Sequence, residues 1–296
     1  MANVNSAASV KTKKKRRSQV VEVWRRLKKN KAAVLGFFIF VIIVLLALTA
    51  PLFIDYDTQI AGYNVRERLQ WPSWKHLFGT DDMGRDLLAR IIYGSRYSLK
   101  IGFLATVVVF VIGVPLGACA GYFGGLTDDI IMRLTDIVGS IPSMLLAMCI
   151  VAALGSSDIN LIIAIGMASV NVYVRLTRAQ VMTIRGSEYV ESARAVGEGE
   201  AEIIVKHILP NCLSPIIVQT TLRVGVSIIR ASSMSFIGLG IKPPSPEWGA
   251  LLSAGRSFIR KNAYMTLFPG LAIMLTVVSL NLLGDGLRDA LDPKQK

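Results

Sequence analysis

Six stretches of the chain are long, apolar and poor in charge, and polar segments separate them. They cover residues 32–53, 101–121, 137–154, 159–174, 213–240 and 262–284. About 20 apolar residues in a helix cross the ~30 Å hydrocarbon core of a bilayer. Backbone N–H and C=O groups find no water partner there, so each stretch must satisfy them internally as a helix. The pattern predicts an all-α integral membrane protein with six transmembrane helices.

The polar segments divide the chain further. A basic tail, residues 1–31, precedes the first span at 32–53, and residues 285–296 form a second tail. Residues 54–100 make a long connection, in which 82–97 has the spacing of an amphipathic helix at the membrane surface. Its apolar positions are Leu87, Leu88, Ile91 and Ile92, and its expected N-cap is Thr80 or Asp81. The other five spans form a transmembrane core, 101–284, which includes the polar connection 175–211.

The formal net charge of +13 is concentrated at the start of the chain, where eleven of the 33 Lys and Arg precede Ala32. A basic segment beside an apolar span is typical of a cytoplasmic anchor at an anionic membrane surface. With six spans, the inner segments then hold 20 Lys and Arg and the outer segments hold 11. We therefore expect both termini in the cytoplasm and contact with membrane lipids. No nucleic-acid-binding motif accompanies the charge, so nucleic acid is not an expected partner.

Motifs for covalent chemistry are sparse. The dipeptide Gly-Lys never occurs, which excludes the phosphate-binding loop of many ATPases. The two histidines and three cysteines are far apart in the sequence, so neither a metal site nor a disulfide framework is predicted. We expect no cofactor on this chain and no catalytic residue, with one rival interpretation. Asp136 and Asp285 border the third and sixth spans and could share a proton as a hydrolase dyad; alternatively both are solvated or cap helices.

Glycines recur every fourth residue in the second span, at Gly113, Gly117 and Gly121. This spacing places all three on one helical face, where the absence of a side chain lets another helix approach closely. The sequence therefore predicts a tightly packed helix pair at this face.

The fifth span contains polar residues at helical spacing: Arg223, Ser227 and Arg230 share one face, and Ser233 follows. An arginine inside a span costs about 2.5–3.5 kcal/mol on insertion scales, so it usually faces protein or water. These four residues are candidates for lining a polar pathway. In the alternative interpretation one arginine reaches a lipid headgroup and the other pairs structurally.

The connection 175–211 contains two predicted short helices. The first begins at Glu188 and ends at Gly197, and the second covers 198–207, before Leu209 and Pro210. A glycine permits the turn between the helices, and a proline is expected to stop the second. Two short helices outside the membrane, rich in Glu and Ala, suit a docking element for a soluble partner. An ordinary solvated connection is the alternative.

This segment resembles a known family. Glu191-Ser192-Ala193, then Gly197, then Leu209-Pro210 is similar to the coupling motif of ABC importer permeases. From about Trp24 to Lys294 the chain looks like the dipeptide/oligopeptide/nickel permease family, in particular its second permease subunit. The supporting runs are 78–86 (FGTDDMGRD), 121–125 (GYFGG), 130–133 (IIMR), 236–240 (FIGLG), 243–249 (PPSPEWG) and 281–293 (NLLGDGLRDALDP).

The resemblance implies a type I ABC importer permease fold in a bacterial inner membrane. It implies a five-part assembly of this chain, a related permease, two cytoplasmic ATPases that bind ATP, and an extracytoplasmic binding protein. The residues expected to couple the permease to an ATPase are Glu191, Ser192, Ala193 and Gly197 in the coupling helix, together with Leu209 and Pro210. The expected cargo is a di- or oligopeptide; nickel and glutathione importers use similar permeases, and a stand-alone channel is a remote alternative.

Two departures from the family pattern concern the coupling helix. Ser192 replaces a middle alanine, and Glu198-Gly199-Glu200 follows Gly197 where the family has small or mixed residues. The second departure adds negative charge beside the expected ATPase contact.

Overall fold

A computed structural model describes residues 19–291, which form helices and loops and contain no β-strand. The helices are α1 (Gln19–Leu27), α2 (Lys31–Phe53), α3 (Leu87–Phe123), α4 (Gly125–Ser140), α5 (Ser143–Leu154), α6 (Asp158–Met167), α7 (Val170–Ile184), α8 (Glu188–Ala195), α9 (Glu200–Ile203), α10 (Leu209–Phe236), α11 (Trp248–Gly255) and α12 (Tyr264–Leu291). Short π- and 3₁₀-helical turns are η1 (Tyr56–Ala61), η2 (Val65–Glu67), η3 (Ile204–Ile208) and η4 (Arg256–Phe258). The predicted tails at 1–18 and 292–296 lie outside the described residues.

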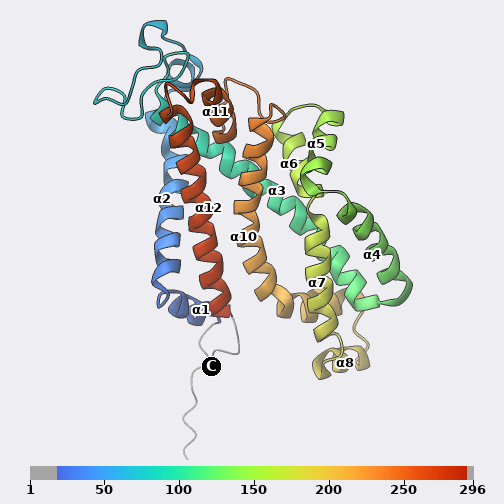
Figure 1. Cartoon of the computed structure of the whole chain (residues 1–296). Coiled ribbons are helices and arrows are strands. Elements are labelled where there is room, and N and C mark those ends of the chain that lie inside the picture. Colours follow the sequence, from blue (N-terminus) through green and yellow to red (C-terminus); the bar gives the residue numbers. More distant parts are fainter. Residues whose placement is uncertain (1–18, 292–296) are drawn as a thin grey trace, which may run out of the picture.

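Four helices are long and apolar enough to cross a membrane alone: α2, α3, α12, and α10 together with the helical residues 200–208 before it. Two bent pairs, α4 with α5 and α6 with α7, pass the same test together, which gives up to six crossings. Figure 1 shows α11 and the loops of residues 54–86 at one end of the bundle, and α1 and α8 at the other. The all-α membrane fold predicted from the sequence is confirmed.

The third and fourth predicted spans are not straight helices, which corrects the sequence prediction. Residues 137–154 include the end of α4, a break at Ile141 and Pro142, and α5, and the two helices meet at 87°. Pro142 has no N–H to donate and disfavours helical geometry in the residue before it. Residues 159–174 bend by 43° between α6 and α7, and α7 then continues to Ile184.

The helix predicted at 82–97 is not a separate element: it begins later, at Leu87, and its residues form the first turns of the helix that contains the second predicted span. Helix α3 begins at Leu87 and runs without interruption to Phe123. Its N-cap is Asp86, which accepts a hydrogen bond from the Ala89 N–H at 2.9 Å, and neither Thr80 nor Asp81 caps it. The apolar face packs against protein: Leu87 and Ile91 are buried with Trp248 of α11.

Asp81 instead organises the loops before α3. Its carboxylate accepts hydrogen bonds from Arg85 Nε at 2.8 Å and from Arg90 Nη1 at 2.5 Å. It also accepts from the backbone N–H groups of Met83 and Arg85, each at 2.9 Å. All three charged side chains are buried. Burial of one carboxylate between two guanidinium groups requires this full set of donors, because an unpaired buried charge is strongly destabilising.

The three glycines of α3 all face α7. A Cβ at Gly113 would lie 2.6 Å from Tyr173 Cβ, and one at Gly117 would lie 2.5 Å from the Val174 carbonyl oxygen. A Cβ at Gly121 would lie 2.8 Å from the Arg178 carbonyl oxygen. Backbone atoms of α7 therefore occupy the space that side chains would fill, which keeps the two helices in close contact.

Substitution of Gly117 by Ala should destabilise this contact. Overpacking a filled core costs about 1–3 kcal/mol, and here the obstacle is backbone that cannot rotate away. The matched control is Gly225→Ala in α10, where the nearest atom to a new Cβ lies at 3.6 Å, an ordinary contact distance. Thermal unfolding in detergent should show a lower Tm for Gly117→Ala and an unchanged Tm for Gly225→Ala. Equal Tm values for both variants would contradict the tight α3–α7 contact.

Candidate functional site

Residues 188–208 form a helical pair, α8 followed by α9 and η3, that extends from the end of the bundle where α1 also lies (Figure 1). Helix α8 begins after Ser187 and carries Glu188 and Glu191 in its first turn, where acidic groups favour a helix start. It ends at a glycine turn: Gly197 has φ +89°, and the Glu198 N–H bonds to the Ala193 carbonyl at 3.2 Å. Glycine adopts this left-handed conformation after a helix without strain, because it has no Cβ.

The helical pair has a buried face and an exposed face. The buried residues are Val190, Ala193, Ile203, Ile204 and Ile208, which join a core cluster with α3 and α7. The exposed residues include Glu188, Tyr189, Glu191, Ser192, Arg194, Val196, Glu200 and Val205. Val196 exposes 83% of its surface and Val205 exposes 62%, values unusual for apolar side chains. Of the predicted docking residues, Glu191, Ser192 and Gly197 are therefore exposed, whereas Ala193 packs the pair onto the bundle.

The two glutamates that depart from the family pattern make contacts within the chain. Glu198 Oε2 lies 2.7 Å from His207 Nε2, which joins the turn to η3. Glu200 accepts a hydrogen bond from the Tyr122 hydroxyl at the end of α3. Glu198 thus stabilises the helical pair internally, and Glu200 attaches it to the bundle.

Arg194, in the last turn of α8, also contacts Tyr122. Its Nη2 donates to the Tyr122 hydroxyl at 3.1 Å, and its guanidinium carbon lies 5.6 Å from the centre of the tyrosine ring. The hydrogen bond raises the pKa of the Arg194 guanidinium, which stays charged at any physiological pH. Nearby, Arg185 Nη1 donates to the Gly121 carbonyl at 3.1 Å. Tyr122 at the end of α3 therefore holds the helical pair through its hydroxyl, and Arg185 joins the end of α7 to the same part of α3.

Leu209 and Pro210 lie where the pair enters the membrane-crossing helix α10. Leu209 is partly buried against the core cluster, and Pro210 is exposed. The prediction that Pro210 ends the second helix is wrong, since helical structure continues from Glu200 to Phe236. The Leu209 N–H bonds to the Ile204 carbonyl, five residues earlier. This π-type turn comes before the proline, whose missing N–H is tolerated near a helix start.

The polar residues of the fifth span lie on α10, mostly inside this chain. Ser227 is buried, with its Oγ 3.4 Å from Thr106 Oγ1 of α3, and Arg230 donates to Ser169 Oγ at the break between α6 and α7. Arg223 is 7% exposed and forms no hydrogen bond or ion pair with another described residue. Ser233 is half-buried and donates to the Ile229 carbonyl of its own helix. Whether these residues line a pathway remains a prediction.

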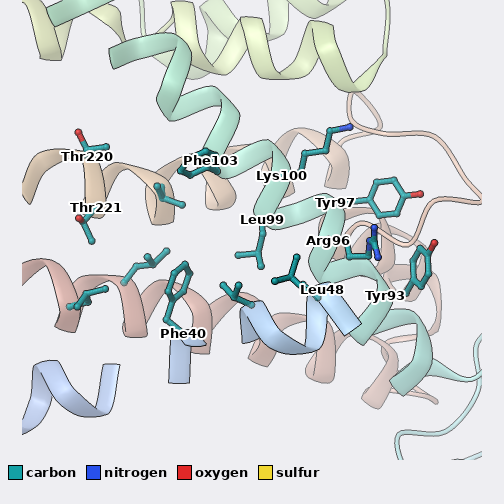
Figure 2. Close-up of a pocket in the computed structure, with 15 residues that line it drawn as sticks. Phe40, Leu48, Tyr93, Arg96, Tyr97, Leu99, Lys100, Phe103, Thr220 and Thr221 are labelled. Carbon is teal, nitrogen blue, oxygen red and sulfur yellow. The ribbon is translucent and has the colours of Figure 1, made fainter. Parts of the chain in front are cut away.

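The sequence did not mark an open groove of about 840 Å³ between α2, α3, α10 and α12. Figure 2 shows Phe40 and Leu48 of α2 opposite Leu99 and Phe103 of α3. Tyr93, Arg96, Tyr97 and Lys100 of α3 lie toward one end, and Thr220 and Thr221 of α10 toward the other. The groove could not be predicted from a local motif, because the four helices that form it are far apart in the sequence.

The two aspartates considered as a hydrolase dyad are not together. Asp136 on α4 pairs with Arg175 of α7 at 2.7 Å, and Asp285 lies on α12. Figure 1 shows α4 and α12 on opposite sides of the bundle. Within residues 19–291, no group of three or more His, Cys, Asp or Glu side chains has the arrangement of a metal site.

The long apolar helices, the two bent pairs and the polar helical pair define a multi-pass membrane transport component. Residues 113–296 match the family described as binding-protein-dependent transport system inner membrane component. Residues 18–72 match the N-terminal transmembrane domain of oligopeptide transport permease C. The chain belongs to the binding-protein-dependent transport family and is a permease subunit of an ABC importer.

Several curated relatives are similar over nearly the whole chain. The dipeptide transport system permease protein DppC of Alkalihalophilus pseudofirmus is 47% identical, over 93% of this chain and 90% of the relative. The di/tripeptide transport system permease protein DppC of Pseudomonas aeruginosa is 44% identical, over 94% and 93%. The glutathione transport system permease protein GsiD of Pectobacterium atrosepticum is 42% identical, over 93% and 91%.

A solved structure shares the fold. A chain of the MetNI methionine ABC transporter in an inward-facing conformation matches with a TM-score of 0.57 and 17% identity, over 70% of this chain and 98% of that chain. The expected importer-permease fold is confirmed by this likeness, which at such low identity concerns the fold alone.

Proposed function

We propose that this permease translocates di- or oligopeptides that an extracytoplasmic binding protein delivers. The observation that carries the proposal is the identity of 47% and 44%, over more than nine-tenths of the chain, with permeases named for dipeptide and di/tripeptide transport. Glutathione is itself a tripeptide, so the 42% relative named for glutathione transport belongs to the same chemical class of cargo.

We further propose that the exposed face of the helical pair docks a cytoplasmic ATPase. The face combines apolar Tyr189, Val196 and Val205 with the acidic Glu188 and Glu191. Apolar side chains surrounded by polar ones are typical of a protein-binding surface. At Gly197 no atom lies within 4 Å of the position that a Cβ would take, which leaves room for the partner. Glu191, Ser192 and Gly197 contact the ATPase in this proposal, while Ala193 and Leu209 pack the pair onto the bundle and Pro210 lies exposed at the junction with α10.

The shared position of α1 and α8 at one end of the bundle supports this orientation (Figure 1). Helix α1 lies within the basic segment 1–31, which carries eleven Lys and Arg and is expected in the cytoplasm. The helical pair is then cytoplasmic, and α11 with residues 54–86 faces the binding protein. A second permease and two ATPases complete the importer, ATP binds to the ATPases, and this chain holds no cofactor.

The direct experiment is reconstitution of the permease pair, the ATPases and the binding protein in proteoliposomes. Labelled dipeptide should enter only when ATP, the ATPases and the binding protein are all present. Entry through the permeases alone would identify a stand-alone channel and refute the proposal. If a nickel complex enters and neither glutathione nor any di- or oligopeptide does, the peptide assignment is refuted while the importer role stands.

A further inference from the structure

Tyr122 connects the membrane-crossing helix α3 to both sides of the turn in the helical pair. Its hydroxyl accepts a hydrogen bond from Arg194 at the end of α8 and donates one to Glu200 at the start of α9. The phenol ring is 6% exposed and belongs to the core cluster that contains Val190, Ala193 and Ile203. One side chain therefore holds the two helices in a fixed relation to each other and to α3.

Other contacts make this arrangement rigid. The Glu198–His207 pair closes the turn onto η3, and Arg185 binds the carbonyl of Gly121, the residue before Tyr122. Helix α3 ends directly after Tyr122, at Gly124 with φ +65°. From there it runs 37 residues to Leu87 at the opposite end of the bundle, about 55 Å at 1.5 Å per residue. A displacement of the helical pair therefore acts on the end of a helix that crosses the whole membrane.

We infer that Tyr122 is the positioning residue through which movement of the helical pair is passed to α3 during transport. The inference rests on the proposed docking of an ATPase at that pair. Arg194 and Glu200 are exposed, but they meet at the part-buried hydroxyl of Tyr122. Hydrogen bonds to charged partners have a fixed direction, whereas apolar surfaces in contact can slide past each other. Without the hydroxyl, the pair still packs on the bundle through its apolar face, but its rotation is no longer tied to α3.

The test is the Tyr122→Phe variant in the complete importer, reconstituted in proteoliposomes. Peptide imported and ATP hydrolysed are measured in the same vesicles, and ATPase binding is measured by co-purification. Phenylalanine keeps the ring and removes both hydrogen bonds. We expect unchanged ATPase binding and a fall of about 2- to 30-fold in peptide imported per ATP hydrolysed, the range of energetic coupling carried by single residues.

Thr183→Val is the control, because it removes an exposed hydroxyl that donates to the Ala179 carbonyl of its own helix, α7, and lies outside the proposed docking face. It should leave the ratio of import to hydrolysis unchanged. Glu200→Gln weakens the same bridge without touching the ring, so it should lower the ratio too, and it serves if Tyr122→Phe fails to fold.

The outcomes separate this inference from the proposed function. A wild-type ratio in Tyr122→Phe or Glu200→Gln, with the ATPases bound, overturns the role of Tyr122 and leaves ATPase docking intact. Failure of the wild-type permease to bind the ATPases overturns the docking itself. A loss of ATPase binding in Tyr122→Phe would reduce Tyr122 to a residue that supports the shape of the docking face, and would also overturn the inference.

Discussion

Replacement of Gly197 by Trp should abolish peptide uptake while the permease still inserts in the membrane and folds. Gly197 has φ +89°, which costs an L-residue about 1–2 kcal/mol. No atom lies within 4 Å of the position that a Cβ would take, so the bulky side chain would project away from the bundle. It would therefore occupy the space where the proposed ATPase contact forms. Uptake in cells and the amount of permease in membranes are the two measurements.

Alanine variants separate backbone strain from obstruction. Gly199 lies two residues further on, with equally open surroundings and an ordinary φ of −67°. Gly197→Ala should lower uptake partly through strain, and Gly199→Ala should have little effect. Normal uptake by Gly197→Trp would show that the turn does not contact an ATPase, and loss of the protein from the membrane would show a folding role instead.

Replacement of Asp81 by Asn should destabilise the protein strongly. The side chains of Asp81, Arg85 and Arg90 are at most 6% exposed, and Asn would remove the one carboxylate with which both guanidinium groups form an ion pair. Breaking a buried ion pair by removing one partner costs about 3–5 kcal/mol. The expected result is a clearly lower Tm in detergent and earlier proteolytic cleavage within residues 54–86.

Asp82→Asn is the control for this prediction, because Asp82 is half-buried and its backbone carbonyl accepts a hydrogen bond from Arg68 Nε at 2.6 Å. Its carboxylate acts on Arg90 only through a charge interaction that is weaker than that of Asp81. The Tm of this variant should stay close to that of the wild-type protein. An Asp81→Asn variant as stable as Asp82→Asn would mean that the arginines find other partners, and that the Asp81 cluster does not hold the loops together.

The apolar pattern was sufficient to predict an all-α membrane protein with up to six crossings, because length and lack of charge act locally along each helix. Breaks within the crossings were missed for a related reason. Pro142 is a local signal for the first break, but the apolar run 137–154 continues across it. Between α6 and α7, at Ala168, no proline marks the bend. The angles of 87° and 43° depend on how these helices pack against the rest of the bundle, and the local sequence gives no information on that packing.

The helical pair was predicted from Gly197 and its flanking acidic helices, since glycine and capping signals are local. Its attachment was not predictable. Tyr122 and Glu200 are 78 residues apart, and the sequence presents Glu198 and Glu200 only as added charge. The prediction of where α3 begins was wrong for a similar reason. Asp81 and Asp86 are both suitable N-cap residues, and Asp86 is the N-cap because the Asp81 carboxylate is instead buried against Arg90.

The most direct test of the account is the accessibility of a single cysteine at position 196, in a permease whose native Cys119, Cys149 and Cys212 are replaced by alanine. Val196 is 83% exposed, so Val196→Cys should react freely with a membrane-impermeant maleimide. The account predicts labelling in inverted membrane vesicles, none in right-side-out vesicles, and protection when the ATPases are bound. Labelling from the outside, or equal labelling with and without the ATPases, would contradict it.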